Sequence, residues 1–274
     1  MIDFEFEFQY AEEKQPTLQK VGGSIPAGRC VVLCGGSGCG KSTLLRCING
    51  LIPQFYEGEL KGFCRLNGQD TAGLRIGEIG ELAASVFQDP RSQFFTVNSS
   101  NEVAFGLENH GLPQDKIRRR VDEAFRIFHL ERLKDRNVYE LSSGERQFIS
   151  ILSAWAMDTD IFLLDEPTAM LDPSGRAEVM KSVEQLRRRG MTIVHITHFM
   201  EETVSADRLI VMSEGRILLQ GTPREVFSRQ EQLRSLSLDV PQMTALAHDL
   251  IRFGADIPAD ILTIKELADC ICPQ

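Results

Sequence analysis

The sequence predicts an α/β protein with a mostly parallel sheet, a helical insertion and a small C-terminal extension. Three observations support this fold class. Apolar runs with strand character alternate with helix-like segments along the 274 residues, which is typical of a parallel sheet with helical crossovers. Between residues 89 and 157 only helical patterns occur, and after residue 220 a further small region follows. The helical stretch therefore interrupts the series of sheet strands.

The strands are indicated by short apolar or alternating runs. Phe4, Phe6, Phe8 and Tyr10 alternate with polar residues, and a period of two is typical of a half-buried strand. A second strand leads into a glycine-rich turn and then into a helical pattern at 42–51. The strands after the first are predicted at 29–34, 82–88, 161–165, 191–197 and 208–213.

Helices are predicted at 102–108, 114–129, 143–157, 241–253 and 264–270. We expect a main domain over residues 1–229, whose helical part covers about 89–157, and an extension over 230–274. The extension carries two apolar stripes at helical spacing, Leu246, Leu250 and Phe253, then Ile261, Ile264, Leu267, Ala268 and Ile271. Two such short helices bury too little surface to be stable alone. Each stripe should pack either on the main domain or on a neighbouring subunit.

Composition and charge exclude several classes of protein. Hydrophobic residues make up 42% and charged residues 25% of the chain, which is ordinary for a folded globular protein. The 30 basic and 39 acidic residues give a net charge of −9. This balance argues against nucleic acid as the main partner, because phosphate binding usually requires a basic excess. No run approaches the roughly 18 apolar residues of a membrane span, and the acidic start is unlike a signal peptide. We therefore expect a soluble, cytosolic protein.

A glycine-rich segment carries the strongest chemical signal. Residues 35–42 fit the pattern G-x-x-x-x-G-K-[ST], with a strand before them and a helix after them. Such a loop wraps phosphates with its N–H groups at a helix N-terminus, a role that a merely structural glycine turn does not need. Lys41 can reach the β- and γ-phosphates, and the Ser42 hydroxyl can bind Mg²⁺. The segment predicts a site for a nucleoside triphosphate.

Two carboxylates follow a buried strand. Four apolar residues at 161–164 precede Asp165 and Glu166. Ligands of α/β proteins bind at the carboxyl ends of the strands, which places both acids near the predicted phosphate loop. Asp165 suits coordination of Mg²⁺ through water. Glu166 suits polarisation of the attacking water as general base.

Residues 141–147, Leu-Ser-Ser-Gly-Glu-Arg-Gln, resemble the signature of ATP-binding cassette (ABC) ATPases. Gln88 resembles the glutamine of this family that binds Mg²⁺ and senses the membrane partner, and Asp172 resembles its D-loop aspartate. His198 resembles the switch histidine that contacts the γ-phosphate. Tyr10 resembles the aromatic residue that stacks on adenine, although it could instead complete the apolar stripe of the first strand.

Together these motifs predict a complete set of site residues. Nucleotide contacts are expected at Tyr10, Gly35, Gly36, Ser37, Gly38, Cys39, Gly40, Lys41, Ser42, Thr43, Gln88, Ser142, Ser143, Gly144, Glu145 and Asp172. The metal ligands are expected at Ser42, Gln88 and Asp165, and the catalytic groups at Lys41, Gln88, Glu166 and His198. The cofactors that the resemblance implies are ATP and Mg²⁺. It also implies an antiparallel N-terminal β subdomain.

The resemblance also implies partners. In the family the signature completes the ATP site of a second ATPase subunit, identical or paralogous. Residues 86–95, residues 102–109 and the C-terminal tail resemble the ATPases of energy-coupling factor importers and of related cobalt and nickel importers. By this resemblance the chain sits at the cytoplasmic face of the membrane. There it would bind a transmembrane coupling protein and a substrate-binding membrane component, and drive uptake of a vitamin or a transition-metal ion.

Three residues depart from the family pattern, and two other functions stay open. Ser143 stands where glycine is usual, Phe148 where a basic residue is common, and Cys39 where a small or polar residue is common. The alternatives are a soluble cassette ATPase acting in DNA repair or translation and a nucleotide-binding regulatory module without turnover. The segment from Gln88 to Phe95 is aromatic for a surface loop. We expect part of it to line a groove for the membrane partner, with burial of its rings in the core as the alternative.

Overall fold

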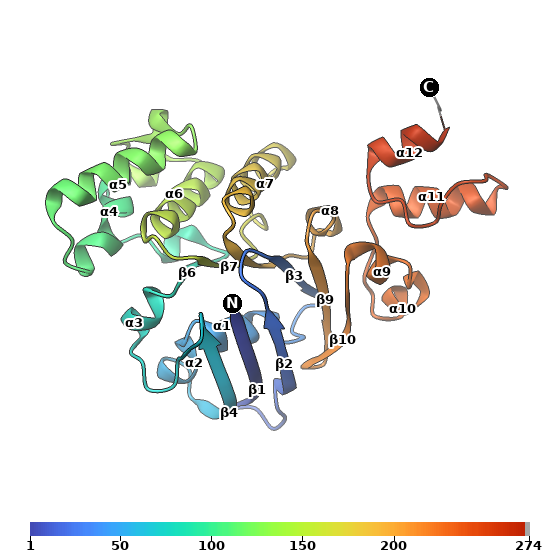
Figure 1. Ribbon diagram of the computed structural model, residues 1–274, viewed down its shortest axis with the longest axis horizontal. Coiled ribbons are helices and arrows are strands. Elements are labelled where there is room, and N and C mark those ends of the chain that lie inside the picture. Colours follow the sequence, from blue (N-terminus) through green and yellow to red (C-terminus); the bar gives the residue numbers. More distant parts are fainter. Residues whose placement is uncertain (272–274) are drawn as a thin grey trace.

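The computed structural model describes residues 1–271 and contains two sheets with helices packed around them (Figure 1). Residues 272–274, the end of the predicted extension, lie outside the described part. The strands are β1 (Ile2–Tyr10), β2 (Leu18–Ile25), β3 (Cys30–Gly35), β4 (Gly58–Leu66), β5 (Gln69–Asp70), β6 (Ala83–Val86), β7 (Ile161–Asp165), β8 (Thr192–Ile196), β9 (Arg208–Ser213) and β10 (Arg216–Gly221).

The helices lie between the two sheets, over the opposite face of the parallel sheet and at the C-terminal end (Figure 1). They are α1 (Lys41–Ile48), α2 (Leu51–Gln54), α3 (Ile76–Gly80), α4 (Ser99–Asn109), α5 (Gln114–Ile127), α6 (Ser143–Ala156), α7 (Pro173–Arg188), α8 (Met200–Thr203), α9 (Pro223–Phe227), α10 (Gln230–Ser235), α11 (Gln242–Arg252) and α12 (Ile264–Ile271). Within residues 1–271, none of these helices combines the length and apolarity needed to cross a bilayer.

The strand order confirms the predicted fold class. The six-stranded sheet has the order β10-β9-β3-β8-β7-β6, and all its neighbouring strands are parallel except β10 and β9. The second sheet is antiparallel, with the order β2-β1-β4-β5. Parallel strands need helical crossovers, and these are the helix-like segments seen in the sequence. The carboxyl ends of β3, β6, β7 and β8 consequently meet at one edge.

Alternation along β3 divides the core into layers. Val31 and Leu33 point into a cluster between the two sheets, together with Phe8 and the apolar face of α1. Their neighbour Val32 points to the opposite face, where it packs with the helices that follow β9 and β10. Burying a ring such as Phe8 contributes roughly 1.5–3 kcal/mol. Helix α1 is therefore clamped between two sheets, which fixes the loop that precedes it.

The helical insertion packs on the strands at the β6 side (Figure 1). Phe125 of α5 and Ile149 of α6 share one apolar cluster with Phe162 of β7. Phe148, where the family resemblance favours a basic residue, lies buried in this cluster. A charged side chain there would lose its hydration without a partner, so burial accounts for the apolar residue.

The C-terminal region packs partly on the main domain and partly on itself. Leu233 and Leu238 join the cluster on the face of the parallel sheet, whereas Ala247, Ile261 and Leu267 form a separate small cluster between α11 and α12. The predicted apolar stripe of α11 is only partly covered: Leu250 packs on this small cluster, but Leu246 and Phe253 are 43% and 91% exposed. On α12, Ile264, Ala268 and Ile271 are exposed as well.

Candidate functional site

The glycine-rich loop is shaped by positions that exclude a side chain. Gly35 ends β3 with φ 150°, and a Cβ there would lie 2.2 Å from the carbonyl oxygen of Met212. Gly40 precedes α1 with φ 104°, and its Cβ would lie 3.0 Å from the carbonyl oxygen of Thr17. No side chain caps the N-terminus of α1. Its first-turn N–H groups are therefore available to an external acceptor.

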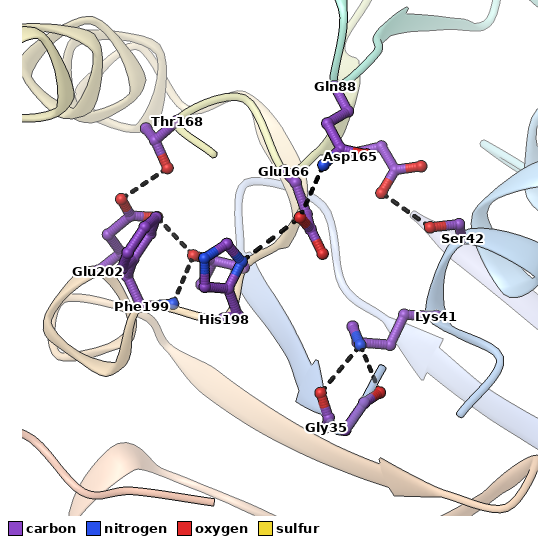
Figure 2. Close-up of polar contacts among 12 residues, drawn as sticks. Gly35, Lys41, Ser42, Gln88, Asp165, Glu166, Thr168, His198, Phe199 and Glu202 are labelled. Carbon is purple, nitrogen blue, oxygen red and sulfur yellow. Dashed lines mark hydrogen bonds and ion pairs between the residues drawn. The ribbon is translucent and has the colours of Figure 1, made fainter. Parts of the chain in front are cut away.

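Lys41 lies folded over this loop. Its Nζ donates to the carbonyl oxygens of Gly35 and Gly36, both at 2.9 Å (Figure 2). The Sγ of Cys39 lies 3.7 Å from the same nitrogen, and both side chains are buried. The loop carbonyls thus hold the Lys41 ammonium at the centre of the loop.

The first carboxylate after β7 contacts the loop helix. Oδ1 of Asp165 accepts a hydrogen bond from the Ser42 hydroxyl at 3.0 Å (Figure 2). Burial raises the pKa of Asp165, and the bond from Ser42 partly opposes that shift. The oxygen atoms of these two residues therefore face each other across the gap between β7 and α1.

The second carboxylate turns toward the neighbouring strands. Glu166 has a left-handed backbone with φ 47°, and its N–H donates to the carbonyl oxygen of Ile196 at 3.0 Å. Its Oε2 lies 3.2 Å from Nε2 of Gln88 and 3.4 Å from Nδ1 of His198 (Figure 2). A left-handed non-glycine residue costs of order 1–3 kcal/mol, so the rest of the fold holds Glu166 in this orientation.

One cavity of about 590 Å³ collects most of the predicted residues. It is lined by Tyr10, Gly35, Ser37, Gly38, Gly40, Lys41, Ser42, Thr43, Gln88, Glu166 and His198, together with Glu13, Thr17 and Arg46. Asp165 lies behind Ser42, to which it is hydrogen-bonded. The structure thus brings together residues from β1, the glycine-rich loop, α1 and the ends of β6, β7 and β8.

Tyr10 belongs both to the cavity and to the apolar layer beneath it. Its ring makes an edge contact with Phe8 at 4.7 Å between centroids, and it packs against the core between the sheets. Its hydroxyl lies 3.2 Å from Oγ1 of Thr43 and accepts from Nη1 of Arg46 at 3.3 Å. Tyr10 therefore completes the apolar stripe of β1 and also lines the cavity.

Three residues of the cavity were not predicted from the sequence. Glu13 and Thr17 lie in the loop between β1 and β2, where no motif marks them, and Oγ1 of Thr17 donates to Glu13 at 2.6 Å. Arg46 lies on α1, five residues after Lys41. The position of Arg46 in the glycine-loop helix is a signal that could have suggested it.

The signature residues Ser142, Ser143, Gly144 and Glu145 lie outside this cavity, at the N-terminus of α6. Oγ of Ser142 accepts from the N–H of Glu145 at 3.2 Å, and Glu145 accepts from the N–H of Ser142 at 3.0 Å. Arg132 also pairs with Glu145, and the bonds to Ser142 and Arg132 lower the pKa of its carboxyl.

Asp172 also lies apart from the lining of the cavity. It is the N-cap of α7, and its Oδ1 accepts from the N–H of Gly175 at 2.8 Å. The structure of a single chain therefore does not bring the signature residues or Asp172 to the glycine-rich loop of the same chain.

The site is that of a P-loop ATP-binding domain, because one cavity joins the glycine-rich loop to the acid-bearing end of β7. Comparison with known proteins specifies the family, since residues 18–169 match the ABC transporter family. The chain belongs to this family and, within it, to the energy-coupling factor transporter ATP-binding proteins. It is an ATPase of the ABC type, as the sequence predicts.

Similar proteins resemble this chain over nearly its whole length. The energy-coupling factor transporter ATP-binding protein EcfA1 of Caldanaerobacter subterraneus subsp. tengcongensis is 41% identical over 97% of this chain and 96% of its own length. The protein of the same name from Clostridium novyi is 41% identical over 95% and 92%. CbiO1 of Clostridium perfringens, part of the ABC transporter complex CbiONQ, has a similar structure. Its TM-score is 0.75 at 34% identity, over 90% of this chain and 98% of that one.

A dimeric ATP-binding cassette solved with ADP and phosphate shares the fold at 24% identity. Its TM-score is 0.70, and the match covers 81% of this chain and 98% of that one.

Proposed function

We propose that the cavity binds ATP with Mg²⁺ and hydrolyses it to power import through a membrane partner. The observation that carries this proposal is the position of the Glu166 carboxylate. It lies between Gln88 and His198 and lines the same cavity as Lys41 and Ser42. In that arrangement the loop N–H groups and Lys41 hold the β- and γ-phosphates. Glu166 faces the space where an attacking water would lie.

The residues around Ser42 fit a magnesium ion. Ser42, Asp165 and Gln88 offer hydroxyl, carboxylate and amide oxygens, and Mg²⁺ prefers a few protein oxygens completed by phosphates and water. Among the described residues no three His, Cys, Asp or Glu side chains are arranged so that they could hold a metal ion, so the site is not an all-protein metal cage. When bound, Mg²⁺ neutralises charge on the phosphates. Burial already raises the pKa of Asp165, and a nearby cation would favour its ionised form.

We assign Glu166 as the general base and His198 as the group that orients it and contacts the γ-phosphate. The Glu166 carboxylate takes the proton of water, and the 3.4 Å contact between its Oε2 and Nδ1 of His198 restricts where the carboxylate can point. Gln88 holds the same oxygen at 3.2 Å from its own loop. A movement of Gln88 would therefore reach the base directly, which links the loop after β6 to hydrolysis.

The substitution Glu166→Gln tests the assignment of the base. We expect ATP binding to be retained and the hydrolysis rate to fall about 10²-fold or more, because the amide cannot take a proton. Glu201→Gln is the matched control, since Glu201 is an exposed carboxylate on α8. Steady-state phosphate release and ATP binding are measured for each variant. Equal turnover of wild type and Glu166→Gln would overturn the role of Glu166.

We further propose that two such ATPase subunits pair, with the N-terminus of α6 from one completing the ATP site of the other. The signature residues and Asp172 lie apart from the chain's own cavity. This supports pairing, because these residues would then contact a nucleotide bound by a second subunit. The C. perfringens relative CbiO1 is part of a complex named CbiONQ. We expect this chain likewise to join a transmembrane coupling protein and a substrate-binding component at the cytoplasmic face of the membrane. The cargo would be a vitamin or a transition-metal ion.

An aromatic groove beside Gln88 is our candidate contact for the coupling protein. A cavity of about 300 Å³ is lined by Phe87, Phe94, Phe95 and Phe105, among others. Phe94 packs against the helical core, whereas Phe95 is 72% exposed and stacks on Phe105 at 4.8 Å. Burial in the core thus describes Phe94, whereas the exposed ring of Phe95 is free to line a groove for the membrane partner. The exposed ring follows the loop that carries Gln88, so a partner bound here could act on the base.

The variant Phe95→Asp tests this contact. We expect it to reduce recovery of the transporter complex from membranes and to reduce uptake, while the basal ATPase rate of the isolated chain stays unchanged. Phe63→Asp, a partly exposed ring on β4, is the control. Affinity purification with mass spectrometry identifies the associated proteins. Normal assembly and uptake with Phe95→Asp would contradict the proposed contact.

We propose that the exposed apolar side chains of Leu246 and Phe253, on α11 and directly after it, contact the same region of a second ATPase subunit. Leu246 lies on α11 and Phe253 is the C-cap residue that follows it, and both side chains are exposed. Phe253→Ser should lower the nucleotide-free dimer fraction in light scattering and leave ATP affinity unchanged. Phe55→Ser, which also removes an exposed ring, is the control. An unchanged dimer fraction would assign these residues no role in association.

A further inference from the structure

A buried carboxylate lies behind the catalytic loops. Glu202 of α8 is 9% exposed. Its Oε1 accepts from the Thr168 hydroxyl at 2.7 Å, and its Oε2 accepts from the Thr197 hydroxyl at 2.6 Å (Figure 2). Burying a carboxylate is costly unless it is hydrogen-bonded, and here each oxygen has a short hydroxyl partner. The carboxylate therefore joins two separate segments of the chain.

Both partners of Glu202 belong to the loops that carry the catalytic groups. Thr168 lies two residues after Glu166, and Thr197 immediately precedes His198. Oγ1 of Thr197 also accepts from the N–H of Phe199 at 3.0 Å. The chain of bonds from Glu202 through Thr197 to Phe199 thus holds the backbone on both sides of His198.

A buried histidine closes the third side of the carboxylate. Nε2 of His195 lies 3.5 Å from Oε2 of Glu202, and it has no hydrogen-bond partner among the described residues. Burial lowers the pKa of His195 to about 4, so the ring is neutral near pH 7. The two threonine hydroxyls are therefore the hydrogen-bond donors to Glu202, and the neutral His195 ring lies beside its Oε2.

We propose that Glu202 is a positioning residue for hydrolysis, which ties the loop of Glu166 to the loop of His198 and so maintains their 3.4 Å contact. The proposal rests on the proposed function, because it assumes that Glu166 and His198 act in turnover. Glu202 itself lies outside the lining of the ATP cavity. It acts only through Thr168 and Thr197.

The substitution Glu202→Ala removes both links at once. We expect kcat to fall about 10- to 100-fold, as a displacement of about 1 Å at a reacting group does, with the KM for ATP within about threefold of wild type. Glu202→Gln should retain most of the activity, because its carbonyl can accept from Thr197 while its NH₂ donates to Thr168. Glu201→Gln, the exposed neighbour on α8, should behave as wild type.

Single-link variants guard against a folding defect in Glu202→Ala. Thr168→Val and Thr197→Val keep the side-chain volume and remove one hydroxyl each. Each should lower kcat more than it changes KM in protein whose circular dichroism matches wild type. A loss of thermal stability with kcat unchanged in all three variants would make Glu202 a purely structural residue and overturn the proposal.

A double-variant cycle separates this inference from the proposed function. If Glu202 works through Glu166, adding Glu202→Ala to Glu166→Gln should change the residual rate less than twofold, because interacting sites are non-additive. A full additional loss in the double variant would contradict coupling through the base. If Glu166→Gln alone had no effect, the proposed function would fail first. If Glu166→Gln is slow but Glu202→Ala turns over normally, only the role of Glu202 is refuted.

Discussion

Helices α1 and α6 both begin at segments that we expect to contact phosphate, yet their N-termini are built in opposite ways. Helix α1 follows Gly40, whose φ of 104° and missing side chain leave the first-turn N–H groups without a cap. Helix α6 begins behind Ser142, which exchanges hydrogen bonds with Glu145 in a reciprocal cap. One helix end is open to a ligand, and the other is satisfied by its own side chains.

This difference indicates how each end meets the nucleotide. The open end of α1 needs an external acceptor for its N–H groups, which suits a loop that encloses phosphates. The capped end of α6 is stable by itself and can be presented as a preformed surface. The Ser142 hydroxyl accepts from Glu145 and still has its own hydrogen to donate. We therefore expect the α6 end to contribute less to ATP affinity than the α1 end.

The largest effect should come from removing the charge at the open end. Lys41→Ala deletes the ammonium held at the centre of the loop and should abolish measurable ATP binding, a loss of about 10²-fold or more. Lys181→Ala, an exposed lysine on α7, is the control. Isothermal titration with ATP checks both. Wild-type affinity for ATP in Lys41→Ala would contradict the expectation that the α1 end contributes more to ATP affinity than the α6 end.

Giving α1 the type of cap that α6 has should also weaken ATP binding. Gly40→Ser places a Cβ 3.0 Å from the Thr17 carbonyl oxygen at a left-handed φ, which should cost about 1–3 kcal/mol of folding stability. We expect ATP affinity to fall at least about tenfold, because the loop geometry is disturbed. Urea unfolding and ATP titration measure the two effects. Wild-type affinity in a folded Gly40→Ser variant would show that the open end is unnecessary.

Removing the cap of α6 should affect association more than binding. Ser142→Ala should cost about 1 kcal/mol of stability as a lost N-cap, with little change in the ATP affinity of the monomer. In a Glu166→Gln background with ATP in the absence of Mg²⁺, light scattering should show a larger dimer fraction than without nucleotide. Ser142→Ala should reduce that increase. A dimer fraction indifferent both to ATP and to Ser142 would refute pairing through the signature.

The smallest effect concerns pH. The N–H of Ser142 and then Arg132 hold the pKa of Glu145 below its ordinary value. A carboxyl whose pKa is lowered by folding stabilises the protein above its unfolded pKa and loses that contribution as pH falls through the folded value. The stability difference between wild type and Glu145→Gln should therefore shrink when urea midpoints are compared from pH 7 down to pH 3. A constant difference would mean that the cap does not depend on the charge.

The strands next to the P-loop were predictable, whereas β2, β4, β5 and β10 were not. The run before the glycine-rich loop and the run before Asp165 are β3 and β7, because both are buried on their two faces and contain apolar residues throughout. Strand β2 escaped prediction, since its pairing with β1 shifts register between Phe6 and Phe8, and its buried residues are spaced irregularly. Strand β4 is mostly exposed and contains Gly62, so no alternation marks it.

The sequence by itself determined the chemistry of the local motifs. The glycine-rich loop, Lys41 and Ser42 are contiguous, and a strand–loop–helix unit sets their geometry through its own backbone. The ABC signature is likewise local, as its cap involves Ser142 and Glu145 within one turn of α6.

Only the tertiary structure decided how distant groups combine. Gln88, Glu166 and His198 meet because β6, β7 and β8 are adjacent parallel strands whose carboxyl ends lie at one edge of the sheet. The pairing of Glu202 with Thr168 spans 34 residues and depends on the same edge. The exposure of Leu246 depends on which face of α11 its neighbours cover. Spacing along the chain carries no information about these contacts, because packing between elements sets them.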